Sequence, residues 1–143
     1  MTNQCKPPFY DDLKAQLRID EGTRLRPYRC TAGKLTIGVG RNLEDTGIDE
    51  AEATFMFARD VDRTLAELES RLPWYRDLAP DAACGLANML FNLGWPRLSG
   101  FKKMLAALEL GDGQEAARQA LDSRWAEQVG DRAKRIAKLL ESA

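Results

Sequence analysis

The sequence contains no histidine, and this absence limits its chemistry more than any other feature of the composition. Hydrolases that depend on a histidine base are excluded, and the commonest zinc ligand is missing. The three cysteines, Cys5, Cys30 and Cys84, are an odd number at wide spacings that match no metal motif and no disulfide framework. We therefore expect free thiols in a reducing compartment, no metal or cofactor, and acid–base chemistry carried by carboxylates, thiols or hydroxyls.

The chain also lacks a strong net charge and a long apolar run. Its net charge is −1 over 143 residues, so no overall field would draw it to nucleic acid, which we do not expect as a partner. No run of about eighteen apolar residues occurs, and residues 1–8 contain no apolar segment of signal-peptide length. We expect the protein to accumulate in the cytoplasm in which it is made.

A short amphipathic helix over about residues 8–21 is predicted to end in a carboxylate. Phe9, Leu13 and Leu17 are spaced four apart and share one face, and Glu21 takes the next position in that row. A carboxyl group that continues a core-facing row is partly desolvated and retains its proton more readily, as a general acid requires. An exposed glutamate at a helix end is the alternative.

A β-hairpin is predicted directly after this helix. Leu35, Ile37 and Val39 alternate with polar residues and glycines, which indicates a half-buried strand with Thr36 on its other face. A tight turn at residues 31–33 would pair the preceding segment with this strand.

The helix end and the hairpin would bring three reactive side chains to one mouth. Eight residues separate Glu21 from Cys30, and five separate Cys30 from Thr36. Together with the segments 17–22 and 36–40, this spacing resembles the signature of phage-type lysozymes, the endolysins of glycoside hydrolase family 24.

This resemblance implies an α+β, mostly helical fold with two lobes in a single catalytic domain. A small β-hairpin or sheet would lie in an N-terminal lobe over about residues 12–60. A linking helix over about 49–72 would lead to a helical lobe of about 73–143 together with residues 1–12.

The resemblance also implies a muramidase that cuts the β-1,4 bond between N-acetylmuramic acid and N-acetylglucosamine in peptidoglycan. Glu21 would be the general acid, with Cys30 and Thr36 assisting the attack of water. Many relatives have aspartate in place of Cys30, and an unperturbed thiol is mostly uncharged at neutral pH. Because the family also admits cysteine here, Cys30 is interpreted as a catalytic variant. It would act as a base if Arg29 or another cation lowers its pKa, with a nucleophile or a bystander as alternatives. A lytic transglycosylase and a wall-binding module with a degenerate site are the rival functions.

Further residues and partners follow from the resemblance alone. Phe91, Asn92 and Gln119 would contact substrate, and Arg132 would orient the acid. Arg41 stands where the family usually has histidine, so an ion pair built on that imidazole is absent. A holin would release the enzyme, expected to be a monomer, from the host cytoplasm to the periplasm and cell wall during lysis by a phage or prophage.

Periodicity predicts the remaining helices. Asp49 is expected to cap a helix of about 23 residues that ends before Pro73. Residues 82–93 are almost wholly apolar and should form the buried centre of the helical lobe, with Cys84 in its core. Asn88 and Asn92 share one face of this helix, either as buried amides bonded to neighbouring backbone or at the border of a cleft. A turn over 94–100, helices at about 101–110 and 113–123, and a last helix follow; the last helix would carry Ala133, Ile136, Ala137 and Leu140 on one side.

Overall fold

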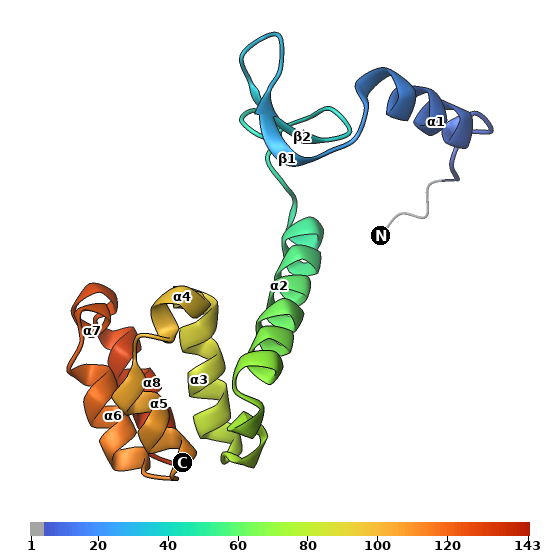
Figure 1. The fold of residues 1–143 in the computed structure, drawn as a ribbon. Helices are drawn as coiled ribbons and strands as arrows, with labels where there is room; N and C mark the ends of the chain where they lie inside the picture. The colour runs from blue at the N-terminus through green and yellow to red at the C-terminus, as the bar shows by residue number, and fades with distance from the viewer. Residues whose placement is uncertain (1–4) are drawn as a thin grey trace. The chain divides into compact units, whose positions relative to one another are not determined.

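The structure, a computed structural model, describes residues 5–143 and has the predicted α+β, mostly helical character (Figure 1). The chain divides into two compact units, Met1–Thr54 and Phe55–Ala143. In chain order the elements are α1 (Tyr10–Glu21), β1 (Arg24–Arg29), β2 (Leu35–Gly38), β3 (Arg41–Asn42), α2 (Glu50–Arg71), the 3₁₀-helix η1 (Pro73–Asp77), α3 (Pro80–Leu93), α4 (Trp95–Leu98), α5 (Lys102–Glu109), α6 (Gly113–Leu121), α7 (Arg124–Val129) and α8 (Asp131–Leu140).

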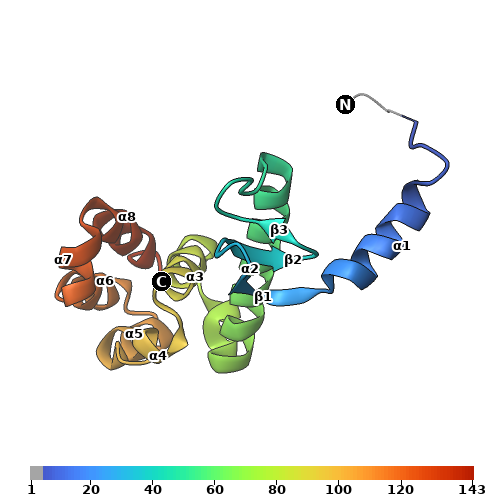
Figure 2. The same ribbon diagram turned by 90° about the horizontal axis from the view of Figure 1, so that it is seen from above.

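The first unit is built around a three-stranded antiparallel sheet in the order β1-β2-β3 (Figure 2). The predicted hairpin is confirmed, because β1 and β2 are antiparallel, with Tyr28 paired with Thr36 and Arg29 with Leu35. Gly33 closes the turn with a φ of +77°, which a glycine adopts without steric cost. The third strand was not predicted; its two residues pair with β2.

Helix α1 forms where it was predicted, but its apolar row is not buried. The side chains of Leu13 and Leu17 are each 43% exposed and that of Phe9 is 60% exposed, and α1 contains no buried residue. The expectation of a core-facing stripe was therefore wrong. Spacing specifies which side chains share a helix face, whereas burial depends on another element covering that face.

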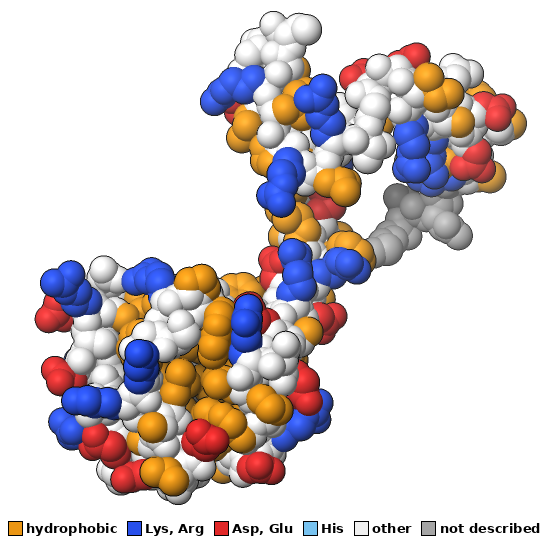
Figure 3. All heavy atoms as spheres, viewed as in Figure 1, with side chains coloured by type: hydrophobic (Ala, Val, Ile, Leu, Met, Phe, Trp, Pro, Cys, Tyr) orange, Lys and Arg blue, Asp and Glu red, His pale blue; other side chains and the backbone are white. Residues whose placement is uncertain are grey.

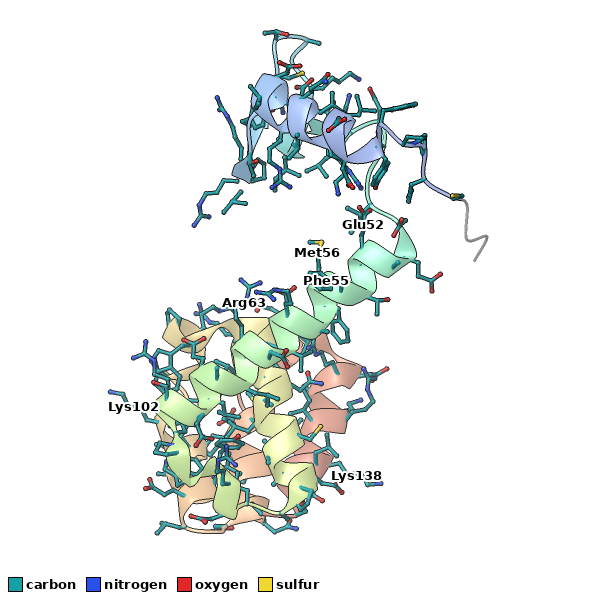
Figure 4. All side chains as sticks on the ribbon, turned by 90° about the vertical axis from the view of Figure 1, so that its right-hand side faces the viewer. Glu52, Phe55, Met56, Arg63, Lys102 and Lys138 are labelled. Carbon is teal, nitrogen blue, oxygen red and sulfur yellow. The ribbon has the colours of Figure 1, made fainter. Side chains whose placement is uncertain are left out.

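Helix α2 begins in the first unit with reciprocal backbone capping. The Asp49 carboxylate accepts a hydrogen bond from the backbone N–H of Glu52 at 2.8 Å, and the Glu52 carboxylate accepts one from the N–H of Asp49 at 2.9 Å. This confirms Asp49 as the predicted N-cap and forms a capping box. Figure 4 shows Glu52 at the start of α2, with Phe55 and Met56 farther along the helix.

The second unit holds the apolar core, with α3 at its centre as predicted. Six residues of α3 are buried, and all four residues predicted for the inner side of α8 are buried as well. Two glycines allow close packing: a Cβ on Gly85 would lie 3.1 Å from Leu139, and one on Gly113 would lie within 2.4 Å of the Glu141 carbonyl oxygen. Figure 3 shows apolar side chains gathered in the middle of the visible face of this unit.

Three details of the second unit differ from or refine the predictions. The turn expected at residues 94–100 contains the short helix α4. Cys84, expected in the core, is exposed, because its position on α3 lies on the face turned away from the buried residues; all three cysteines are free thiols. The two short helices expected next are confirmed as α5 and α6. No helix within residues 5–143 is long and apolar enough to cross a membrane.

Candidate active site

The β1–β2 turn holds Cys30 in a cluster of polar groups. Its backbone N–H donates to the Lys34 carbonyl at 3.0 Å, and its carbonyl accepts from the N–H of Gly33 at 2.8 Å. The pKa of the Cys30 thiol is lowered from its ordinary value, chiefly by hydrogen bonding from the backbone of Lys34, then from that of Ala32, and also by the side chain of Thr36. Partial burial opposes this effect. The site thus favours the thiolate, the form in which cysteine acts as a base.

Thr36 is the buried polar residue of the sheet and contacts Cys30. It is 3% exposed, and its hydroxyl donates to the Lys34 carbonyl at 2.9 Å. The predicted alternation had placed Thr36 opposite the buried face, whereas it is more buried than its half-buried neighbours Leu35 and Ile37. The reason is its place on the central strand, where Tyr28 and Asn42 flank it on the two sides. A buried hydroxyl with a fixed acceptor gives Cys30 a rigid neighbour.

Glu21 is the last residue of α1, and Gly22 follows it with a φ of +70°. Its side chain is exposed, so the desolvation expected for it is not found. The Glu21 carboxyl group instead lies against the backbone of Gly40: a Cβ built on that glycine would be 2.9 Å from Oε2. The carboxyl thus packs beside the segment that follows β2, although it is not enclosed by apolar side chains.

An ion pair joins β3 to the start of α2. The Arg41 guanidinium meets both carboxylate oxygens of Glu52 at 2.6 Å. Hydrogen bonding to Arg41 is the main cause of the lowered pKa of Glu52, and the same bond raises the pKa of Arg41. This arginine–glutamate pair ties the sheet to α2.

The residues assigned to substrate all lie in the second unit. Phe91 packs edge-to-face on Phe57 with ring centroids 6.2 Å apart. Both rings line an apolar cavity of about 400 Å³, to which Cys84, Asn88 and Arg132 also contribute.

Two amides of α3 are engaged by side chains that lie far away in the sequence. Arg132 donates to Asn88 Oδ1 through Nη2 at 2.7 Å and through Nε at 3.2 Å. Trp125 Nε1 donates to Asn92 Oδ1 at 2.7 Å. Asn88 and Asn92 are exposed rather than buried, and each amide oxygen has a side-chain donor rather than the neighbouring backbone considered at the outset.

Gln119 is oriented by a carboxylate on its own helix. Its amide nitrogen donates to Glu115 Oε1 at 2.7 Å, and Arg118 binds both oxygens of that carboxylate at 2.8 Å. These bonds, with Arg118 first, lower the pKa of Glu115 to about 2. Gln119 also lines a cavity of about 590 Å³ together with Lys103 and Trp125.

Comparison with known proteins shows which family the sequence matches. The family model described as phage lysozyme matches residues 18–141. The chain belongs to the phage lysozyme family. As a phage lysozyme it is a glycoside hydrolase with a lysozyme-like α+β fold, and peptidoglycan is its substrate.

The relatives of this phage lysozyme include proteins of quite different length. It is 26% identical to "Probable T4-type lysozyme 2" of Dictyostelium discoideum, in a match that covers 91% of this chain and 94% of that protein. It is 30% identical to the pre-baseplate central spike protein of Enterobacteria phage T4, over 90% of this chain but only 27% of that protein.

Within this phage lysozyme the candidate residues form two groups. Cys30 contacts Thr36, and Glu21 contacts Gly40, all in the first unit. The substrate candidates and Arg132 lie in the second unit, so the pairing of Arg132 with the acid stays a prediction. No cluster of three metal-ligating side chains occurs within residues 5–143.

Sequence reasoning missed three contacts of the site region. The Asn88–Arg132 bond joins residues 44 positions apart, and no local pattern marks it. The Arg41–Glu52 pair also lacked a signal, although the charged residue at a position usually held by histidine indicated that something replaces the imidazole. The Glu21–Gly40 contact had a partial signal in the glycine of a strand-like segment, which often marks a close approach.

Proposed function

We propose that this phage lysozyme is a muramidase in which Glu21 is the general acid and Cys30, supported by Thr36, activates water. The substrate bond is the β-1,4 link between N-acetylmuramic acid and N-acetylglucosamine. The environment of Cys30 supports the proposal: two backbone amides and the Thr36 side chain lower the pKa of its thiol. The resemblance implies that this thiol takes the place of a catalytic aspartate in many relatives.

The reaction needs one group that gives a proton and one that removes a proton. Glu21 protonates the glycosidic oxygen as the bond to the anomeric carbon breaks. The Cys30 thiolate takes a proton from a water molecule, whose oxygen attacks the opposite face of the anomeric carbon. Inversion by this route needs the acid and its partner to be about 6.5–9.5 Å apart, so that water fits between them.

Thr36 supports this step in two ways. Its buried hydroxyl is hydrogen-bonded to the Lys34 carbonyl, and this bond holds the Thr36 side chain in place beside Cys30. The hydroxyl also lowers the pKa of Cys30 when its single proton turns from the Lys34 carbonyl to the sulfur. A threonine at this position therefore orients the thiol and tunes its pKa.

The second unit is proposed to bind the glycan. Phe91 offers an exposed aromatic side chain for a sugar ring, and Gln119 offers an amide already oriented by Glu115. Asn92 keeps its amide NH₂ group for substrate, because its oxygen accepts from Trp125. The role of Arg132 in orienting the acid is proposed on the resemblance alone.

We also propose that the enzyme serves lysis of the host by a phage or prophage. It would act as a monomer, stay in the host cytoplasm until a holin opens the inner membrane, and then reach the cell wall from the periplasm. Expression with and without a holin tests this: only co-expression should clear the culture, and clearing without a holin would contradict the proposed release.

The released muropeptides test the reaction itself. A muramidase adds water, so mass spectrometry should find reducing N-acetylmuramic acid ends. A lytic transglycosylase gives anhydro ends that are lighter by one water, and a wall-binding module releases nothing. Glu21→Gln should abolish release, while Glu50→Gln, which removes an exposed carboxylate from the first turn of α2, should not. Anhydro ends, or release by Glu21→Gln, would overturn the proposal.

A further inference from the structure

Gly40 lies directly against the side chain proposed as the general acid. An ideal Cβ at this glycine would be 2.9 Å from Glu21 Oε2, 3.1 Å from Cδ and 3.2 Å from Cγ. All three atoms belong to the outer half of one side chain, and none of them is backbone. The space that a methyl group would need at position 40 is thus occupied by the Glu21 carboxyl group.

Backbone conformation alone does not account for this feature. Gly40 has a φ of +68°, in the region that favours glycine, and Gly38 has almost the same value, +69°. A Cβ on Gly38, however, would meet nothing within 4 Å. The two glycines therefore share the same backbone requirement, and only Gly40 adds a requirement for empty space beside Glu21.

We propose that Gly40 is a positioning residue whose missing side chain sets where the Glu21 carboxyl group rests. This inference rests on the proposed role of Glu21 as the acid. Glu21 is exposed and ends a helix, so an added methyl group would displace its carboxyl group rather than disturb a packed core. The fold would tolerate the displacement, whereas proton transfer would not, because a shift of about 1 Å in a reacting group can cost about a hundredfold in rate.

The matched pair Gly40→Ala and Gly38→Ala separates contact from backbone strain. Both variants place a Cβ on a residue with positive φ, so we expect both melting temperatures to fall by a similar amount. On a soluble peptidoglycan oligomer, kcat of Gly40→Ala should fall about ten- to a hundredfold below that of Gly38→Ala, with KM nearly unchanged. Equal kcat values in the two variants would overturn the inference.

A second pair of variants tests the inference if the alanine variants do not fold. Asparagine tolerates positive φ better than alanine does, so Gly40→Asn and Gly38→Asn carry less strain while still adding a Cβ. The same difference in kcat is expected between them.

A double-mutant cycle tests the partner. In a Glu21→Asp background the side chain is shorter by one methylene, so Gly40→Ala should reduce kcat much less than it does in the wild-type background. A reduction of equal size in both backgrounds would show that Gly40 does not act through Glu21. If Glu21→Gln itself retained full activity, the proposed function would be contradicted. If Glu21→Gln is inactive but the Gly40 and Gly38 variants have equal kcat values, only the role of Gly40 is contradicted.

Discussion

The two units of the molecule differ in what their side chains do. In the second unit, apolar side chains of α3, α5, α6 and α8 pack into the core, and its buried hydrophobic residues extend from Leu68 to Leu140. In the described part of the first unit, Thr36 is the buried residue, and the remaining contacts are strand pairs, ion pairs and turns. Cys30, the proposed base, and Glu21, the proposed acid, both belong to this sparsely packed unit.

This contrast shows how an apolar core and a set of polar contacts can reside in different parts of one small enzyme. Polar groups that must meet water and substrate cannot be enclosed in an apolar core without losing solvation. In the second unit, buried apolar side chains stabilise the fold. In the first unit, hydrogen bonds of the backbone hold the strands and turns that carry the polar side chains. Mutations in the two units should therefore act on different measurements.

The largest effect on folding is expected from Leu86→Ala in α3. Leu86 is fully buried, so its truncation should lower the free energy of unfolding by about 2–5 kcal/mol through lost burial and a cavity. The matched variant Leu13→Ala removes the same atoms from the exposed row of α1 and should cost less than about 1 kcal/mol. Urea denaturation of both variants measures the difference. Equal losses in the free energy of unfolding would contradict the difference in packing between the two units.

A smaller effect, on rate alone, is expected from Cys30. Cys30→Ala removes the proposed base and should lower kcat about ten- to a hundredfold, with little change in melting temperature. Cys30→Asp restores an acid–base group and should retain or raise activity. The cell-wall clearing rate of the two variants checks this, and equal activity in both and in the wild type would show that the thiol does no chemistry.

The junction between β3 and α2 should respond more modestly. Asp49→Ala removes the carboxylate that accepts from Glu52 N–H, and should cost about 1 kcal/mol. Hydrogen exchange should become faster in the first turn of α2 and stay unchanged in α3. Faster exchange throughout α3 would show that the two units do not unfold separately.

The mildest effect concerns acid stability of the second unit. The folded pKa of Glu115 is about 2, lowered from 4.5, mainly by Arg118. Its stabilising contribution is therefore complete above about pH 4.5 and is lost as the pH falls through about 2. Glu115→Gln should lose less stability than wild type over this window, as measured by thermal melts. Parallel curves for the two proteins would contradict the ion pair.

Local patterns in the sequence predicted much of the fold. The hairpin turn, the Asp49 cap and the inner face of α8 follow from turn chemistry, capping and the 3.6-residue period, which act over a few residues. The exposed row on α1 and the exposed Cys84 were not predictable in this way. Their burial depends on which surfaces other elements cover, and that is set by tertiary packing.

The candidate site shows the same division. The spacing of Glu21, Cys30 and Thr36 was readable from the sequence, and the Cys30–Thr36 contact follows from the hairpin register. The contact of Arg132 was not, because it joins residues 44 positions apart, and the contact of Gly40 had only the partial signal of a glycine in a strand-like segment. Glu21 is exposed rather than desolvated, and this too required coordinates.

The central claim is that Glu21 supplies the proton that breaks the glycosidic bond. The most direct measurement is kcat of Glu21→Gln on peptidoglycan, taken beside its melting temperature. We expect a loss of about a hundred- to ten-thousandfold in kcat with the melting temperature unchanged. A folded Glu21→Gln enzyme that still cleaves peptidoglycan at the wild-type rate would contradict it.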